Sequence, residues 1–369
     1  MANLEMKKLR FYKFVAQMAG VLLITGLLIS ADNPDTEYKI YQFPQNQMPR
    51  IDGEFSDWDM VPESYRIGLD QLMDTERGMG TDLNPEDYNI NVKVGWVKDL
   101  NRLYFYLEAE DDYWSFEDKA LSQDIFELVV DGNLSGGPFI KKHNGNIKRF
   151  PFEELHFKGH GAHAQNYHIF TPVQNKDEVM VWGSTPWIKE FPYYNAAYDF
   201  DFKHGESGKL KMEFWITPFD HAAFEGIGRS TVTQLKEDAI IGLSWCIIDY
   251  DKSEKFEGFM NLAHDTKMIY DASFLNTFRL MPLEKEYLKP IEANWAFVEM
   301  DRNQRWIQFK DLSIGNITKW HWDFGDGNVS LEKNPSHNYE KAGEWTVVLT
   351  VEGPEGKSVR SKVWDVVTE

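Results

Sequence analysis

The chain has 369 residues, 42% of them hydrophobic and 27% charged, which is the composition of a globular protein long enough for two domains. Its formal net charge is −20. A surface this acidic repels phosphate backbones and anionic membranes, which argues against nucleic acid as a partner. Neutral sugars and divalent cations remain compatible with it.

The first 31 residues have the pattern of a secretory signal peptide. A basic segment ends at Lys13, an apolar run extends from Met18 to Ile29, and the small residues Ser30 and Ala31 follow. The apolar run is shorter than the roughly 18 residues expected of a membrane-spanning helix. We therefore expect cleavage near Ala31 and a secreted, periplasmic or cell-surface protein without a membrane span. An uncleaved N-terminal anchor is the alternative.

Short runs in which apolar and polar residues alternate predict strands between residues 40 and 285. Such runs cover Ile90 to Trp96, Leu103 to Leu107 and Leu210 to Ile216. The runs Ile125 to Val130 and Ile240 to Ile248 are continuously apolar, as central strands of a sandwich can be. Because no segment keeps a helical period beyond a few turns, residues 40–285 predict one large antiparallel β-sandwich with long loops.

Cys246 is the only cysteine of the chain. An intramolecular disulfide is therefore impossible, and the fold must depend on its hydrophobic core. Because Cys246 lies within the apolar run Ile240 to Ile248, we expect a buried thiol rather than a reactive one.

The C-terminal part begins with a charged linker around Leu283 to Asn294, and residues 286–369 hold a second series of short strands. These strands are predicted at Trp306 to Phe309, Trp320 to Trp322, Trp345 to Val351 and Val359 to Val366. Glycine, asparagine and proline turns separate them at the spacing of a small β-sandwich.

Three motifs mark this second domain: Trp322-Asp-Phe-Gly-Asp-Gly327, Asn334-Pro-Ser-His-Asn-Tyr339 and Gly343-Glu-Trp-Thr-Val347. Together they resemble the PKD domain family over residues 291–369, with Trp345 where the family usually has tyrosine. The resemblance implies an immunoglobulin-like sandwich that serves as a spacer or interaction module. Glycines interleaved with aspartates predict a tight turn rather than a catalytic site.

The start of the larger domain, Ile51-Asp-Gly-Glu-Phe-Ser-Asp-Trp58, is similar to the opening of a family 9 carbohydrate-binding module. The similarity continues through residue 131. The resemblance implies a sandwich that binds sugars and, in the family, often holds structural calcium. The acidic residues that match the family pattern are Asp111, Asp112, Asp124 and Asp131; the alternative is that they are ordinary turn residues.

Aromatic residues are dense in two segments of this domain that we interpret as loops. Flat rings stack on the C–H faces of sugars, and polar neighbours hydrogen-bond to the hydroxyls. We predict a sugar platform in the segment Trp182 to Tyr198, aided by Trp114, with the remaining rings in the core. The predicted carbohydrate-binding residues are Trp114, His163, Asn166, Trp182, Trp187, Tyr193 and Tyr194.

Four histidines are concentrated at positions 156, 160, 163 and 168. They could be metal ligands, but their spacing matches no H-E-x-x-H signature, and hydrogen-bonding loop or strand histidines are the alternative.

No enzyme motif stands out, because the chain has no G-x-S-x-G elbow, phosphate-binding glycine loop or C-x-x-C pair. We therefore expect a noncatalytic protein that captures polysaccharide or oligosaccharide at or outside the cell envelope, with calcium as the one cofactor to consider. The alternatives are a polysaccharide hydrolase or lyase that uses residues 139–235, and a surface adhesion or structural protein.

Overall fold

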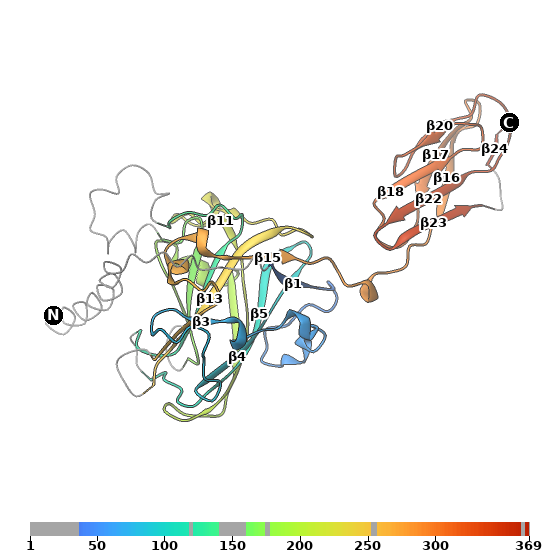
Figure 1. The fold of residues 1–369 in the computed structure, drawn as a ribbon. Coiled ribbons are helices and arrows are strands. Elements are labelled where there is room, and N and C mark those ends of the chain that lie inside the picture. Colours follow the sequence, from blue (N-terminus) through green and yellow to red (C-terminus); the bar gives the residue numbers. More distant parts are fainter. Residues whose placement is uncertain are drawn as a thin grey trace. The chain divides into compact units, whose positions relative to one another are not determined.

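The computed structural model describes residues 37–117, 121–139, 160–173, 178–251, 257–362 and 366–368. The expected signal peptide lies outside these residues. The chain divides into two compact units, Met1–Pro282 and Leu283–Glu369 (Figure 1). Across the described residues, the regular structure is β-strand with short 3₁₀ turns, and no helix is long and apolar enough to cross a membrane. The all-β prediction is confirmed.

Two sheets face each other in the first unit. The first sheet contains, in spatial order, β8 (Val179–Val181), β7 (Gln165–Phe170), β6 (Ile125–Asp131), β13 (Ile240–Asp249) and β15 (Asn276–Leu280). The second contains β4 (Tyr88–Val97), β5 (Leu100–Asp111), β10 (Gly208–Ile216) and β9 (Tyr194–Asp199). Neighbouring strands within each of these series are antiparallel.

Strand β1 (Tyr38–Phe43) joins the two sheets. Its first half, Tyr38 to Ile40, pairs with β15, and its second half, Tyr41 to Phe43, pairs with β4. Both pairings are parallel, an exception to the otherwise antiparallel order. Short additional strands complete the unit: β2 (Ile67–Gly68), β3 (Met73–Asp74), β11 (Phe219–His221), β12 (Thr231–Val232) and β14 (Gly258–Asn261).

The core lies between the sheets and follows the alternation in the sequence. The side chains of Ile90, Val92 and Val94 in β4 are at most 1% exposed, and they pack in one cluster with the inward residues of the facing strands. A second apolar cluster lies on the outer face of the first sheet and includes Cys246, which is fully buried as expected. Both faces of β6 and β13 are covered, which explains their continuously apolar sequences.

The segment from Trp182 to Tyr193 closes the sandwich at one edge. Strands β8 and β9 lie at opposite ends of the strand order but are consecutive in the chain, so their connection crosses from one sheet to the other. It contains a 3₁₀ turn at Pro186–Lys189. The Trp187 ring packs edge-on against Tyr193 and Phe219, with centroid separations of 5.1 and 5.4 Å.

The opening motif of the first unit is fixed by one carboxylate. Glu213 of β10 is fully buried and accepts hydrogen bonds from the backbone N–H groups of Asp52 and Gly53, both at 2.9 Å. Its second oxygen accepts from Nε1 of Trp58 at 3.2 Å. This motif therefore anchors the N-terminal segment to the second sheet.

The second unit is a small β-sandwich (Figure 1). Its separate core surrounds Trp295, Phe309 and Trp322. One sheet contains β16 (Trp295–Asp301), β17 (Trp306–Asp311) and β20 (Ser336–Asn338). The other contains β19 (Val329–Ser330), β18 (Lys319–Asp323), β22 (Val348–Gly353) and β23 (Gly356–Ser361). Strand β21 (Gly343–Trp345) pairs with β24 (Val366–Thr368).

The aspartate–glycine motif of this unit forms the predicted tight turn. Asp323 accepts a hydrogen bond from the N–H of Gly325, and Asp326 accepts one from the N–H of Asn328. Asp326 also contacts His337 at 2.7 Å, and the His337 ring stacks on Phe324 with a centroid separation of 4.2 Å. A hydrogen bond and a ring stack thus connect the turn to the second motif of this unit, Asn334 to Tyr339.

We predict that Gly325→Ala destabilises the isolated fragment 283–369 more than Gly327→Ala does. Both glycines have positive φ, +82° and +92°, so alanine costs about 1–2 kcal/mol at each position. Only at Gly325 would the new Cβ meet another atom, the Thr346 carbonyl oxygen at 2.6 Å. Overpacking of this kind adds about 1–3 kcal/mol to the loss in the free energy of unfolding. Urea denaturation measures both values, and equal losses would contradict the prediction.

Candidate functional site

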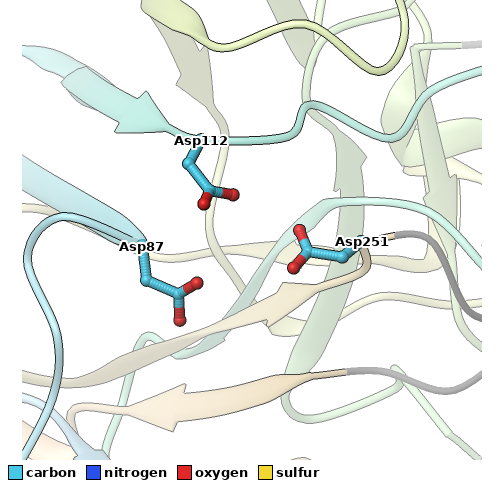
Figure 2. Close-up of side chains that lie close together, drawn as sticks. All are labelled: Asp87, Asp112 and Asp251. Carbon is cyan, nitrogen blue, oxygen red and sulfur yellow. The ribbon is translucent and has the colours of Figure 1, made fainter.

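Aspartates from both sheets meet at one end of the sandwich. Asp87 immediately precedes β4, Asp111 is the last residue of β5, and Asp249 is the last residue of β13. Asp112 and Asp251 follow β5 and β13 closely. Figure 2 shows the carboxylates of Asp87, Asp112 and Asp251 converging on a common space.

These aspartates form two groups with the geometry of cation ligands. One carboxylate oxygen each from Asp87, Asp112 and Asp251 lies within 4.8 Å of the others, and the same holds for Asp111, Asp249 and Asp251. Calcium binds oxygen at about 2.3–2.6 Å, so oxygens at such separations can contact a single ion. Carboxylates are hard ligands that suit calcium or magnesium.

Two oxygens of this cluster are buried without a hydrogen-bond partner among the described residues: Oδ2 of Asp111 and Oδ1 of Asp249. The two side chains are 5% and 2% exposed. Burial, reinforced by the neighbouring carboxylates, raises the pKa of Asp111 to about 7 and the pKa of Asp249 to about 9. A buried carboxylate without a partner is costly, and a bound cation would relieve that cost.

Asp124, one of the predicted metal ligands, has a different position. Its two oxygens accept hydrogen bonds from the backbone N–H groups of Ser115 at 2.5 Å and Tyr250 at 2.8 Å. Burial and the nearby Asp111 raise the pKa of Asp124. Asp124 thus connects the loop that follows β5 with the loop that follows β13, and it belongs to neither ligand group.

Asp131 was expected in the same site, and the structure corrects this expectation. Asp131 ends β6, whereas Asp124 precedes it, so seven residues of extended chain at about 3.3 Å each separate them. Oδ2 of Asp131 instead accepts a hydrogen bond from the N–H of Gly136 at 2.7 Å. The sequence spacing that suggested a common site is the length of a strand.

We predict that the melting temperature in cation-free buffer falls as the pH rises from 5 to 9. In the unfolded chain an aspartate has a pKa of about 3.9, and folding raises this value for Asp111 and Asp249. The stability that these protonated groups contribute is complete below pH 4 and is lost as the pH passes about 7 and about 9. Calorimetry of the parent and of Asp249→Asn tests this. Between pH 7 and 9 the melting temperature of the variant should fall less than that of the parent. Identical slopes of melting temperature against pH in the two proteins would contradict the raised pKa of Asp249.

A cleft of about 560 Å³ lies at the opposite end of the sandwich, where β6 ends and β7 begins. Its polar rim includes Asn133, Ser135, His163, Ser184, Asp220 and His221, and its apolar side includes Ala222, Ala223 and Phe224. The Phe224 ring is 70% exposed. An exposed flat ring beside hydroxyl, amide, imidazole and carboxylate groups can stack on and hydrogen-bond to a polar ring compound.

The predicted sugar-binding residues are mostly inside the protein. Trp114 has no exposed surface, and its ring stacks on Phe202 with a centroid separation of 5.1 Å. This corrects the expectation of an exposed platform ring at Trp114. Trp182 and Tyr194 are 7% and 4% exposed, because their segment fills the edge between the sheets. Asn166 is 1% exposed and donates to Glu127 at 2.7 Å within the first sheet.

Three of the predicted residues lie at or near the cleft. His163 lines it, with Nε2 3.3 Å from the carbonyl oxygen of Gly137. Trp187 is partly buried, and its Nε1 donates to the carbonyl oxygen of Ala223 at 2.9 Å, which connects it to the cleft wall. Tyr193 is partly buried against Trp187.

The histidine cluster does not form one metal site in the described residues. His156 lies outside the described residues. The His160 ring packs against Phe139 with a centroid separation of 4.5 Å. Nε2 of His168 is 2.8 Å from the Glu127 carboxylate, and both side chains are buried. Burial raises the pKa of Glu127, but the contacts with His168, Asn166 and Cys246 together outweigh this effect and lower the pKa overall. His168 therefore belongs to a buried polar pair.

Sequence reasoning missed Phe224, Asp220 and His221 at the cleft, and Asp87, Asp249 and Asp251 in the acidic cluster. The aspartates had a usable signal, since Asp249 and Asp251 directly follow the apolar run Ile240 to Ile248. Phe224 had no such signal, because neither its residue type nor its neighbours in the sequence indicate an exposed ring.

The comparison with protein families gives a match in the second unit. A model described as PKD domain matches residues 294–368. Residues 294–368 form a PKD domain. The Asp323–Gly327 turn and the stack of Phe324 on His337 are therefore features of this PKD domain.

Curated relatives match over short segments. Collagenase ColQ1 of Bacillus cereus is 46% identical over 60 residues, 15% of this chain and 6% of that protein. Collagenase ColA of Clostridium perfringens is 30% identical over 130 residues, 32% of this chain and 12% of that protein. Pre-pro-metalloprotease PrtV of Vibrio cholerae is 48% identical over 46 residues, 12% of this chain and 5% of that protein. The matches therefore span only a small part of each relative.

Solved structures resemble each unit. A family 9 carbohydrate-binding module from Caldicellulosiruptor kristjanssonii, in complex with cellotriose, has a TM-score of 0.44 and 13% identity, covering 69% of this chain and 98% of that one. The PKD1 domain of Vibrio anguillarum Epp has a TM-score of 0.20 and 27% identity. It covers 22% of this chain and 99% of that one.

Proposed function

We propose that this chain is a noncatalytic carbohydrate-binding protein and that its first unit binds sugar in the cleft beside Phe224. The observation that carries the proposal is the exposed Phe224 ring on the wall of a cleft of about 560 Å³ with a polar rim. This volume lies within the roughly 300–1,000 Å³ range of small-ligand sites. An exposed ring on a cleft wall offers a flat face on which a sugar ring can stack.

The loop that carries Phe224 is held in place before any ligand arrives. The N–H of Ala223 donates to Oγ of Ser230 at 2.9 Å, and that hydroxyl donates to the carbonyl oxygen of Gly226 at 2.9 Å. The Ala223 carbonyl accepts from Trp187. A fixed loop loses little conformational freedom on binding, which favours affinity.

The polar rim supplies partners for sugar hydroxyls. Asn133 and His221 are exposed, and Asp220 is half-buried with Oδ1 accepting a hydrogen bond from Thr233 at 2.7 Å. The other Asp220 oxygen is then available to accept from a hydroxyl. Because the whole chain carries a net charge of −20, a neutral sugar suits it better than an acidic one.

The place of action that we propose is outside the cytoplasm, at or beyond the cell envelope. This rests on the signal-like pattern of residues 1–31, which N-terminal sequencing of the exported protein would test. In this arrangement the PKD domain is a spacer or interaction module.

We predict that Phe224→Ala weakens glycan binding and that Phe191→Ala does not. Both phenylalanines are exposed, at 70% and 77%, but only Phe224 lines the cleft. Loss of a stacked ring costs about 1–3 kcal/mol, which is roughly one to two decades in affinity. A glycan array identifies the ligand, and calorimetric titration compares the variants. Equal affinities for the parent and Phe224→Ala, at unchanged melting temperature, would place the site elsewhere.

A second candidate function is polysaccharide cleavage, because two carboxylates, Asp220 and Glu225, line the same cleft. Glycosidases use a pair of carboxylates on either side of the scissile bond. Reducing-sugar assays on every glycan that binds separate the two functions. Release of reducing ends that is lost in Asp220→Asn would establish the enzyme, and binding without release supports the noncatalytic protein.

A further inference from the structure

We propose that the cleft beside Phe224 selects sugars that carry a free amino group, which is protonated and therefore cationic. This inference rests on the proposed function, because it names the class of sugar for the same cleft. Three features carry it: the carboxylates that line the cleft, a further carboxylate behind its wall and the exposed ring of Phe224.

The charged groups that line the cleft are acidic. Apart from two histidines, its ionisable side chains are the carboxylates of Asp220 and Glu225, and no lysine or arginine belongs to the described lining. Glu225 has a cationic neighbour, since Nη1 of Arg229 lies 3.7 Å from its Oε1. The Arg229 side chain is 76% exposed, however, so water and salt weaken this pair. The cleft therefore keeps a negative potential that favours a cationic ligand.

A further carboxylate lies directly behind the cleft wall. Asp131 has no exposed surface, and both of its carboxylate oxygens lie 3.5 Å from Oγ of Ser135, which lines the cleft. Water screens a buried charge poorly. The negative potential of Asp131 therefore reaches the cleft through Ser135 and adds to that of the lining carboxylates.

An ammonium group matches these acceptors better than the other common substituents of a sugar do. It has three N–H donors and no acceptor, whereas a hydroxyl is both donor and acceptor and an N-acetyl group adds a carbonyl acceptor. Oδ1 of Asp220 accepts from the Thr233 hydroxyl at 2.7 Å, which holds the carboxylate in place and leaves its second oxygen for a ligand. A hydrogen bond between two charged groups is about twice as strong as a neutral one.

The Phe224 ring favours the same class of sugar. The ring is 70% exposed on the cleft wall, and the carboxylate of the next residue, Glu225, lines the same cleft. The face of an aromatic ring attracts a cation that lies within about 6 Å of its centre. A sugar that stacks on Phe224 can therefore place its ammonium group between the ring and a carboxylate.

The test compares three β-1,4-linked tetrasaccharides that differ at carbon 2 of each sugar: the tetramers of glucosamine, N-acetylglucosamine and glucose. Calorimetric titration of the full chain at about pH 7, where such an amine is mostly protonated, gives the three affinities. We expect the glucosamine tetramer to bind about tenfold more tightly than the two neutral tetramers. Tetralysine carries ammonium groups without sugar rings and should bind more weakly than the glucosamine tetramer. Equal affinities for these two would show that charge alone attracts the ligand and would overturn the proposal.

Asp220→Asn separates a local contact from the charge of the whole chain. Asparagine keeps an acceptor for Thr233 but removes the charge, so affinity for the glucosamine tetramer should fall about tenfold, while affinity for the neutral tetramers stays the same. The matched control is Asp201→Asn, which removes the same charge from an exposed residue beside Phe202, whose ring stacks on Trp114. It should leave every affinity unchanged. Equal losses in the two variants would overturn the proposal. If Asp220→Asn melts below the parent, Glu225→Gln takes its place in this comparison.

The outcomes also separate this inference from the proposed function. A neutral glycan that binds as tightly as the glucosamine tetramer, and loses affinity in Phe224→Ala, would show that the cleft binds sugar without selecting an amino group. The inference then fails and the proposed function stands. If no glycan binds, whether neutral or cationic, both fail.

Discussion

The parallel pairing of β1 with both β15 and β4 is the constraint on which the first unit depends. It makes the two sheets one hydrogen-bonded system along one edge, so the core between them has a fixed boundary there. Among the described residues, no strand joins β8 to β9 at the opposite edge. The chain closes it with the aromatic segment Trp182 to Tyr193, and this explains why rings that suggest a surface platform are largely core residues.

The same strands connect two sites of different character. Strand β6 begins beside the acidic cluster and ends beside the cleft, and β5 and β13 end at the cluster. The cluster occupies an end where buried charge opposes folding, and the cleft occupies an end where loops rather than strands determine the surface. In the proposed function, the end with the acidic cluster affects stability, and the end with the cleft recognises the sugar.

Local patterns predicted the elements, because alternation in β4, β5 and β10 reports the faces of a strand directly. The PKD turn was also predictable, since its glycines and aspartates act within six residues. Neither the double pairing of β1 nor the joining of Asp111 with Asp249 could be predicted in this way. Both bring together residues more than 50 positions apart, and such contacts depend on strand order rather than on any local sequence.

The distinction between Trp114 and Phe224 has the same origin. A tryptophan next to two aspartates at a strand end suggests an exposed loop, yet the Trp114 indole donates to the Gly208 carbonyl and stacks on Phe202. The Phe224 ring, by contrast, is 70% exposed, and nothing in its local sequence indicates this. Residue type sets the free energy of burial, whereas the topology decides which rings find a partner.

Chemical modification of Cys246 can measure local opening of the first unit. This thiol is alone in the chain and fully buried, and it pairs across the sheet with Glu127 of β6 and Asn261 of β14. Its Sγ lies 3.5 Å from the Glu127 carboxylate, and burial raises the pKa of the thiol. An alkylating reagent can therefore reach the thiol only when the apolar cluster on the outer face of the first sheet opens. The rate of its modification measures how often that cluster opens, and no engineered label is needed.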